Sequence, residues 1–353
     1  RMKRFSYRPR PVRKTYIPKS NGKLRGLGIP CYEDKLVQGA MADVLNEIYE
    51  NIFLDFSYGF RPKKNCHQAI SQINWLLMTK KVNYILDADI KGFFDNIDHD
   101  IMMTFLEHEI EDKNFLRYIR RFLKSGILED YKYYESDKGT PQGGLISPIL
   151  ANVYLHYVLD NWFNVISKKF KGEMYLIRYA DDFVVMFQYE EEARKFYKML
   201  IERMNKFKLE LAEDKTRILP FGRFKGTKEE FNFLGFTFSN GKTLNGKYRP
   251  NIKTNKKKLK QKFEVAKKWL HDKMHEPILE VGLSIRKKII GHYAYYGING
   301  NYSSLFKYYK YLKYTWYHTL RKRGQKNKIK YLDYLRIWNY LGIPMPKVYV
   351  NIW

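Results

Sequence analysis

The sequence predicts an α+β protein, and three observations support this prediction. The stretch from Met174 to Phe187 is apolar on both sides of a polar Asp-Asp turn, which is typical of a β-hairpin. Segments with apolar residues at helical spacing lie before and after it, and residues 251–325 are helical in pattern almost throughout. The chain has 353 residues, of which 44% are hydrophobic, so it is large enough for two or three domains with buried cores.

The first eighty residues predict one short strand and two helices. Residues 15–19 predict the strand, and the Ser, Asn and Gly of residues 20–23 favour a turn. A helix is predicted over 33–53, because acidic residues at its start suit the helix dipole and an apolar stripe follows at helical spacing. A second helix is predicted over 65–78.

The middle of the chain alternates between strands and helices. These are predicted over 84–90 (strand), 99–125 (helix), 174–187 (hairpin), 190–207 (helix) and 231–238 (strand). Another helix is expected to begin at Ser147-Pro148, with Ser147 as its N-cap and Pro148 as its first residue. Gly297 and Gly300 interrupt the helical pattern of the last third.

The positive charge is large and unevenly distributed. The chain carries a net charge of +28, and the segment from Gly241 to Trp353 alone holds 26 Lys and Arg against 5 Asp and Glu. A protein this basic usually binds a polyanion. Aromatic rings in the same segment suit stacking on nucleic-acid bases, although we expect more than half of them to be helix core. They are Tyr293, Tyr295, Tyr296, Tyr302, Phe306, Tyr308, Tyr309, Tyr311, Tyr314, Trp316 and Tyr317.

Other classes of protein find no support in the sequence. Cys31 and Cys66 belong to no C-x-x-C pair, so we expect neither a zinc site nor a disulfide framework, which fits a reducing cytoplasm. The chain has no signal peptide and no run of 18 apolar residues, so we expect no membrane span and no membrane partner. It opens on Arg1 rather than Met, so we expect an N-terminal piece to be absent from this sequence.

Three acidic residues at the ends of predicted strands point to catalysis. Asp89 follows an apolar strand, and Asp181 and Asp182 form the tip of the predicted hairpin. A lone Asp-Asp turn is usually a solvated loop, but three close carboxylates on partly buried strands repel each other unless cations neutralise them. Mg²⁺ prefers such hard oxygen ligands, and two ions make a phosphoryl-transfer site. One ion would lower the pKa of a primer 3′-hydroxyl, and the other would hold the triphosphate.

Five sequence blocks, in this order, resemble those of the group II intron-encoded reverse transcriptase/maturase family of bacteria. They are residues 56–62 (FSYGFRP), 89–99 (DIKGFFDNIDH), 139–152 (GTPQGGLISPILAN), 178–182 (RYADD) and 231–236 (FNFLGF). The resemblance implies a right-hand polymerase whose antiparallel palm sheet is backed by helices. It implies fingers at 1–82, palm at 83–98, a fingers–palm connection at 99–138, palm at 139–250, a helical, maturase-like thumb at 251–325 and a short DNA-binding-like tail at 326–353.

The resemblance also implies a role for individual residues. The catalytic carboxylates would be Asp89, Asp181 and Asp182, which together with Ile90 would bind two Mg²⁺ ions, for which Mn²⁺ would substitute. Nucleotide-binding residues would be Lys19, Arg25, Phe94, Gln142 and Lys215. Template and primer contacts would come from Arg61, Pro141, Gly143, Leu234 and Gly235. The ring of Phe94 would leave no room for a 2′-hydroxyl, whereas we interpret Phe93 and His99 as structural.

The implied activity is copying of RNA into DNA. The implied partners are an RNA template (a structured intron RNA), a DNA or RNA primer, dNTPs and a target DNA, in the cytoplasm of a bacterium. Three alternatives stay open: a domesticated group II-like enzyme in defence or hypervariation, a maturase-only RNA-binding protein, and an RNA-dependent RNA polymerase, against which Phe94 argues. No His/Cys cluster follows the thumb, so we expect no HNH-type endonuclease in this sequence.

Overall fold

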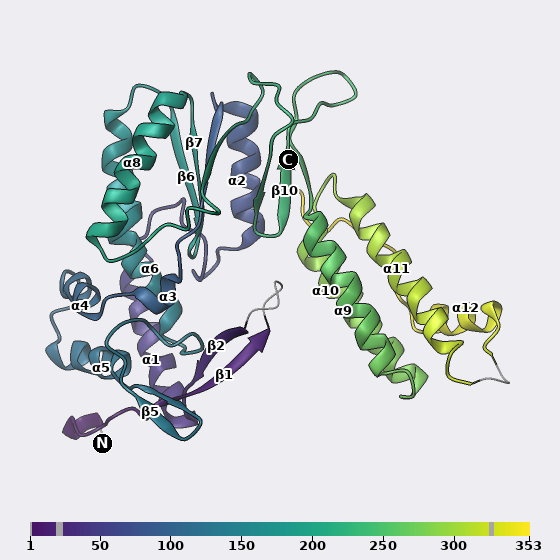
Figure 1. Cartoon of the computed structure of the whole chain (residues 1–353), viewed down its shortest axis with the longest axis horizontal. Helices are drawn as coiled ribbons and strands as arrows, with labels where there is room; N and C mark the ends of the chain where they lie inside the picture. The colour runs from purple at the N-terminus through teal and green to yellow at the C-terminus, as the bar shows by residue number, and fades with distance from the viewer. Residues whose placement is uncertain (1, 19–23, 325–327) are drawn as a thin grey trace. The chain divides into compact units, whose positions relative to one another are not determined.

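The computed structural model describes residues 2–18, 24–324 and 328–353, which belong to two compact units (Figure 1). The first unit comprises Arg1–Thr227 and the second Lys228–Trp353. Along the described part of the chain, no helix is both long and apolar enough to cross a membrane.

A four-stranded antiparallel sheet lies at the centre of the first unit. Its order is β6-β7-β3-β8, made of β3 (Tyr84–Ala88), β6 (Met174–Tyr179), β7 (Asp182–Phe187) and β8 (Arg217–Pro220). Helix α8 (Glu190–Lys206) packs against β3 and β7, and α2 (Cys66–Thr79) packs against β6 (Figure 1). Because helices cover this sheet, the residues of β7 after Asp182 are all buried.

This unit also contains other helices and helical turns. They are the short η1 (Met2–Arg4), α1 (Tyr32–Tyr49), α3 (Phe93–Asn96), α4 (His99–Glu107), α5 (Lys113–Leu123), α6 (Ser147–Leu155), α7 (Asn161–Ile166) and η3 (Ser167–Lys169), with a π-helical turn, η2 (His156–Asp160), between α6 and α7. The single helix predicted over 99–125 is wrong, because α5 starts afresh at Lys113. The Asp112 carboxylate caps it by accepting hydrogen bonds from the backbone of Asn114 and Phe115.

A second sheet of the first unit has the order β2-β1-β4-β5. Its strands are β1 (Val12–Pro18), β2 (Leu24–Ile29), β4 (Ile127–Glu129) and β5 (Lys132–Tyr134). β1 pairs antiparallel with β2 and parallel with β4. The predicted strand near residue 15 is therefore present as β1, whereas Lys19 and the predicted turn at 20–23 lie outside the described residues.

Ser147 does not cap its helix, contrary to the prediction. Ile146 occupies the N-cap position of α6 without a side-chain cap, and Ser147 is already helical. The hydroxyl of Ser147 instead donates a hydrogen bond of 2.9 Å to the carbonyl of Pro141. The side chain thus fixes the preceding loop rather than the helix end.

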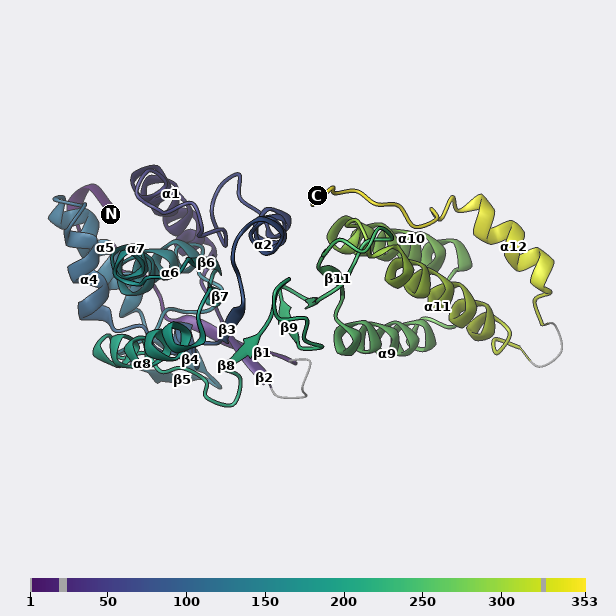
Figure 2. The same ribbon diagram turned by 90° about the horizontal axis from the view of Figure 1, so that it is seen from above.

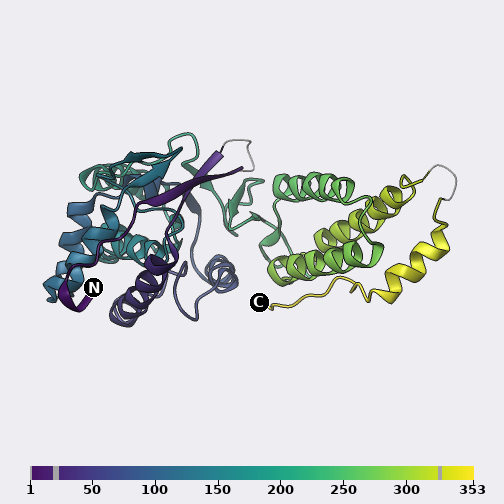
Figure 3. The ribbon, with the colours of Figure 1, turned by 90° about the horizontal axis from the view of Figure 1, so that it is seen from below.

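The second unit joins a small antiparallel sheet to four helices. The sheet has the order β11-β10-β9, made of β9 (Glu230–Phe233), β10 (Phe236–Ser239) and β11 (Asn251–Thr254). The helices are α9 (Lys256–Asp272), α10 (Ile278–Tyr296), α11 (Tyr302–Leu320) and α12 (Tyr331–Tyr340), and α11 packs against both α9 and α10 (Figure 2 and Figure 3). β9 and β10 replace the single strand predicted over 231–238. Leu234 and Gly235 take φ values of 48° and 81°, which make a tight turn.

The aromatic residues of the second unit divide between core and surface. Among the eleven rings noted in the sequence, Tyr293, Tyr296, Tyr308, Tyr309 and Trp316 are buried. The other six keep some exposure, so the expectation that more than half would be core is wrong by one ring. The rings that stay exposed on α11 are therefore available for another purpose.

Candidate active site

The three catalytic candidates lie at one end of neighbouring strands. Asp181 and Asp182 follow β6 at the hairpin turn, where Ala180 takes a left-handed φ of 57° and Tyr179 pairs with Asp182. β3 lies beside β7 in antiparallel register, with Ala88 opposite Phe183, so Asp89 comes at the same end. Asp181 is partly buried and Asp182 is exposed. The topology thus brings together carboxylates that are 92 positions apart in the sequence numbering.

Electrostatics tie these carboxylates to a lysine. The Lys215 ammonium hydrogen-bonds Asp89, and this bond is the main cause that raises the pKa of Lys215. Burial raises the pKa of Asp181, and the charge of Asp89 raises it further, while Arg25 and Arg178 oppose the shift. Burial also raises the pKa of Asp87, to about 6. The site therefore concentrates negative charge, and a cation stabilises it.

The residues fit a divalent metal in the kind of donor they offer. Asp89, Asp181 and Asp182 supply hard carboxylate oxygens, and Ile90, whose side chain is buried and apolar, offers an oxygen only through its backbone carbonyl. Among the residues that the structure describes, no three His, Cys, Asp or Glu side chains form a ready-made metal cluster. The Lys215 ammonium neutralises the charge of the Asp89 carboxylate, as a bound metal cation would.

A hollow of about 620 Å³ holds most of the predicted nucleotide-binding residues. Arg25 from β2, Phe94 from α3, and Pro141 and Gln142 from the following loop all line it. The Arg25 guanidinium donates a 2.5 Å hydrogen bond to the Gln142 side-chain oxygen. Phe94 is 8% exposed and packs edge-on against Phe93, with ring centroids 5.4 Å apart. Three separate sequence segments therefore build one concave site.

The loop that carries Gln142 is locked to its neighbours by backbone contacts. The Gly28 amide donates to the Gln142 carbonyl at 2.9 Å, and the Thr140 amide donates to the Phe94 carbonyl at 2.8 Å. Gly143 takes a φ of 132°, and a Cβ there would lie 2.7 Å from the Gly28 carbonyl oxygen. Only glycine allows this approach, so the glycine that follows Gln142 sets the position of the loop.

A buried charge network, which the sequence analysis missed, supports the catalytic turn. Arg178 and Asp160 are both fully buried, and the Arg178 Nε donates to Asp160 Oδ1 at 2.8 Å while its Nη2 donates to the other carboxylate oxygen. Arg178 Nη1 donates to the Asn152 side chain and to the Ala180 carbonyl, both at 3.0 Å. The guanidinium therefore holds the backbone immediately before Asp181. A buried arginine needs a buried acid as its partner, so Arg178 calls for such an acid, but the sequence does not identify Asp160 as that acid.

The segment 56–62 is pressed against the same turn. The Asn152 side chain donates to the Gly59 carbonyl at 2.7 Å. A Cβ on Gly59 would lie 2.2 Å from the Ala180 backbone nitrogen, so the chain passes at a distance that only glycine permits. Tyr58 and Arg178 are joined by a backbone hydrogen bond of 2.8 Å. Three of the five sequence blocks thus meet behind Asp181 and Asp182.

Other predicted residues are placed differently. The Arg61 side chain is buried, binds Glu50 through two hydrogen bonds, and donates to the carbonyls of Leu54 and Ser57. The structure therefore does not support Arg61 as a template contact. His99 is buried and hydrogen-bonds the Gly139 carbonyl at 2.7 Å, as a structural histidine does.

Leu234 and Gly235 belong to the second unit, at the β9–β10 turn. The hydroxyl of Tyr295 donates to the Leu234 carbonyl at 2.8 Å, and the Asn255 amide donates to the Gly235 carbonyl at 3.0 Å. The turn is thus fixed to α10 and to the start of α9.

Known proteins similar to this chain agree on one family. A family model described as "Reverse transcriptase (RNA-dependent DNA polymerase)" matches residues 17–238. The group II intron-encoded protein LtrA of Lactococcus lactis subsp. cremoris is 32% identical, over 91% of this chain and 66% of its own length. Protein YkfC of Escherichia coli (strain K12) is 32% identical, over 69% of this chain and 70% of its own length. This chain thus spans just under two thirds of LtrA.

Solved structures share the fold. A telomerase from Candida albicans, determined in complex with a TWJ fragment of telomeric RNA, aligns with a TM-score of 0.56 over 96% of this chain and 61% of its own. The two are 14% identical, so the likeness concerns the fold alone. The predicted α+β class and right-hand polymerase fold are confirmed by this likeness together with the antiparallel sheets and helices described above.

Proposed function

Since the chain belongs to the reverse transcriptase family, as its matched residues 17–238 show, we propose that it extends a primer with deoxynucleotides along an RNA template. The observation that carries the proposal is the hollow lined by Arg25, Phe94 and Gln142, because its Arg25 acts electrostatically on the catalytic Asp181. Arg25 lines this hollow, hydrogen-bonds Gln142, and acts electrostatically on Asp181. A triphosphate at Arg25 would therefore lie close to the catalytic turn.

Asp89, Asp181, Asp182 and the backbone of Ile90 would hold two Mg²⁺ ions, for which Mn²⁺ would substitute. Bound ions would lower the pKa of the primer 3′-hydroxyl and neutralise charge on the leaving pyrophosphate. Lys215 already lies against Asp89 and would offer its charge to the triphosphate. Each of these residues acts by charge and position, and none forms a covalent bond with the substrate.

Arg25, Phe94 and Gln142, which line the hollow, would select and orient the nucleotide. Lys19 and Arg25 would bind the triphosphate, and Gln142 would contact the nascent base pair. The Phe94 ring, which is braced by Phe93, would lie under the sugar and exclude a 2′-hydroxyl. We also propose that template and primer contacts come from Pro141, Gly143, Leu234 and Gly235.

A second function is favoured by the charge of the last third of the chain. That segment holds 26 Lys and Arg against 5 Asp and Glu, and LtrA is an intron-encoded protein. We therefore also propose that the protein binds a structured intron RNA as a splicing maturase, and a target DNA, in a bacterial cytoplasm. We keep the fingers, palm and thumb boundaries of the sequence analysis as a proposal. In the structure β9 and β10, which fall within the proposed palm, belong to the same compact unit as the helices from residue 256 onward.

Primer extension tests the first function. The wild-type chain and Asp181→Asn/Asp182→Asn are compared on an RNA template with Mg²⁺ and dNTPs, and in parallel with rNTPs. We expect extension with dNTPs by the wild type and a loss of about a thousandfold or more in the variant, because the charge that stabilises the transition state is removed. Equal extension by both proteins would refute the assignment of the site.

The same variant separates the second function from the first. Splicing and binding of a group II intron RNA should survive in Asp181→Asn/Asp182→Asn, because the basic surface of the second unit is unchanged. If neither protein binds the intron RNA more tightly than an unrelated RNA of equal length, the maturase proposal is wrong.

A further inference from the structure

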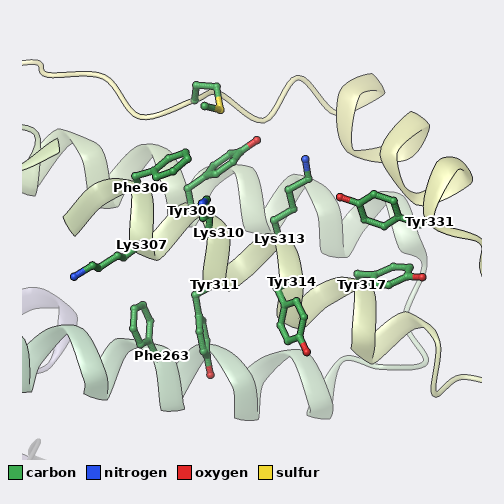
Figure 4. A pocket seen from close by; sticks show the side chains of 11 residues that line it. Phe263, Phe306, Lys307, Tyr309, Lys310, Tyr311, Lys313, Tyr314, Tyr317 and Tyr331 are labelled. Atoms are coloured by element: carbon green, nitrogen blue, oxygen red, sulfur yellow. The ribbon is translucent and has the colours of Figure 1, made fainter. Parts of the chain in front are cut away.

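One face of α11 carries exposed rings and lysines that the proposed chemistry does not use. A hollow of about 820 Å³ in the second unit is lined along this helix by Phe306, Tyr314 and Tyr317, and at its edge by Tyr331 (Figure 4). The opposite side of α11 is core, where Leu312 and other residues are fully buried. The helix thus has a packing side and a side on which rings remain open to solvent.

These rings keep part of their surface open to solvent. Tyr314 is 66% exposed and Tyr331 is 50% exposed, while Phe306 and Tyr317 are half-buried. Tyr317 meets Tyr331 edge-on, with centroids 5.2 Å apart and planes at 77°, so the two rings form a corner. A contiguous aromatic surface of this kind usually marks a binding site.

The charge of the hollow selects the class of ligand. Lys307, Lys310 and Lys313 line it, and no acidic residue is among its described lining residues. These lysines recur every three positions, so their successive Cα atoms are spaced by roughly 4.5 Å along the helix axis. Lys310 Nζ lies 4.5 Å from the centroid of the Phe306 ring, which places a cation directly over an aromatic face. A ligand that satisfies this surface must offer both flat rings and negative charges.

A second hollow continues the same surface on the other side of Tyr314. Its volume is about 530 Å³, and it shares Tyr311 and Tyr314 with the first. Lys267 and Lys268 from α9 and Lys322 line it, with Glu264 as the one acidic residue among its described lining residues. The exposed ring of Tyr314 therefore has cations on both sides.

We propose that this face of α9 and α11 binds a single-stranded nucleic acid. Bases would stack on Tyr314, Tyr317 and Phe306, and the phosphates between them would contact the lysines of both hollows. In a duplex the base faces are already stacked on each other, so only an unpaired strand can use the exposed rings. This site goes beyond the proposed polymerisation, because it needs neither the carboxylates nor a nucleotide, and it differs from the proposed intron-RNA binding because it takes an unpaired strand rather than a structured RNA.

The test measures binding of a fluorescent unstructured oligonucleotide of about 12 nucleotides, as RNA and as DNA, to the whole chain. Unlabelled blunt-ended RNA–DNA duplex, which has no unpaired overhang, is present in excess, and Mg²⁺ and dNTPs are omitted. We expect Tyr314→Ala/Tyr317→Ala to weaken binding of the single strand by about tenfold or more, the loss expected for base–aromatic stacking. Tyr340→Ala, which removes an exposed ring outside both hollows, should leave it unchanged.

Two further readouts keep the result independent of folding. Lys307→Gln/Lys310→Gln should lower the slope of log K against log salt by about 1.4, since each lost phosphate contact accounts for about 0.7 on a single strand. The Lys287→Gln control, which removes a lysine outside both hollows, should leave the slope unchanged. A 4-thiouridine in the RNA should crosslink to the peptide that contains Tyr314.

The outcomes divide clearly. A loss in the ring variant with both RNA and DNA identifies a general single-strand site, and a loss with RNA alone identifies an RNA site. Complete displacement of the oligonucleotide by the duplex, equal losses in the ring variant and the Tyr340→Ala control, or crosslinks only outside the second unit would overturn the proposal.

Discussion

Two pairs of opposite charges lie beside the same catalytic turn, and they differ most in exposure. Arg178 and Asp160 have fully buried side chains, whereas the side chains of Lys215 and Asp89 are 62% and 27% exposed. The buried pair is joined by two hydrogen bonds and also holds the Ala180 backbone. The exposed pair is joined by one contact that solvent, a cation or a phosphate can replace.

Burial, rather than residue type, decides whether an Asp paired with a cation has a structural or a chemical role. A desolvated ion pair cannot exchange partners without a large cost, so Arg178 and Asp160 position the turn. A solvated pair costs little to separate, so Lys215 and Asp89 are free to take part in chemistry. A substitution that breaks the buried pair should therefore lower stability, whereas one that breaks the exposed pair should lower activity and leave stability unchanged.

The largest effect is expected from breaking the buried pair. Arg178→Met leaves Asp160 charged and unpaired in the core, which should lower the free energy of unfolding by about 3–5 kcal/mol. The control is Arg194→Met, which removes a surface arginine paired with Glu190 and should change stability by less than about 0.5 kcal/mol. Urea unfolding of the three proteins measures the difference, and a similar stability for wild type and Arg178→Met would contradict the role of the network.

Breaking the exposed pair should alter activity and spare stability. Lys215→Met removes a charge from the triphosphate side of the site, so we expect primer extension to slow by about tenfold to a hundredfold. The melting temperature should stay within about 2 °C of the wild type, because exposed ion pairs contribute about 0–1 kcal/mol. Lys208→Met, which breaks a similarly exposed pair with Asp98, is the matched control and should extend normally. Equal rates for the two variants would remove Lys215 from the site.

The smallest expected effect is on the pH dependence of stability, and it comes from a buried histidine whose pKa is shifted by burial and a neighbouring lysine rather than by an acid. Burial, together with the charge of Lys262, whose Nζ lies 3.2 Å from the His292 Nδ1, lowers the pKa of His292 to about 3. Below about pH 6.5 His292 binds a proton in the unfolded chain but stays neutral in the folded chain. Its contribution to the free energy of unfolding is therefore fully present above that pH and is lost as the pH falls.

The expected loss is about 1.4 kcal/mol at roughly pH 5.5 relative to roughly pH 7.5. His292→Asn lacks the titrating group, so its unfolding free energy should fall less over the same interval. Urea unfolding at both pH values measures this, and identical pH dependence in the two proteins would show that His292 does not titrate on unfolding.

Much of the site was predictable because it is encoded locally. The Asp-Asp turn, the strand before Asp89 and the loop around Gln142 each follow from short patterns of apolar, acidic and glycine residues. Spatial partners contributed by distant segments were not predictable in the same way. Nothing local in the π-helical turn indicates that Asp160 would meet Arg178.

Two residues have surroundings that their local sequence does not indicate. Arg61, which we expected to contact the template, has its guanidinium bonded inside the fold by Glu50 and the carbonyls of Leu54 and Ser57. The segment 231–238 was predicted as one continuous strand, but Leu234 and Gly235 take positive φ values and turn the chain between β9 and β10.

The same substitution at two carboxylates tests the account most directly. Asp89→Asn and Asp160→Asn are each measured for melting temperature and for RNA-templated primer extension on one preparation. We predict that Asp89→Asn melts no lower than the wild type and extends about a thousandfold more slowly or worse. Asp160→Asn should melt about 10 °C lower, because it breaks a buried charge pair. Wild-type extension by Asp89→Asn, or an unchanged melting temperature for Asp160→Asn, would contradict the division between a buried frame and an exposed catalytic layer.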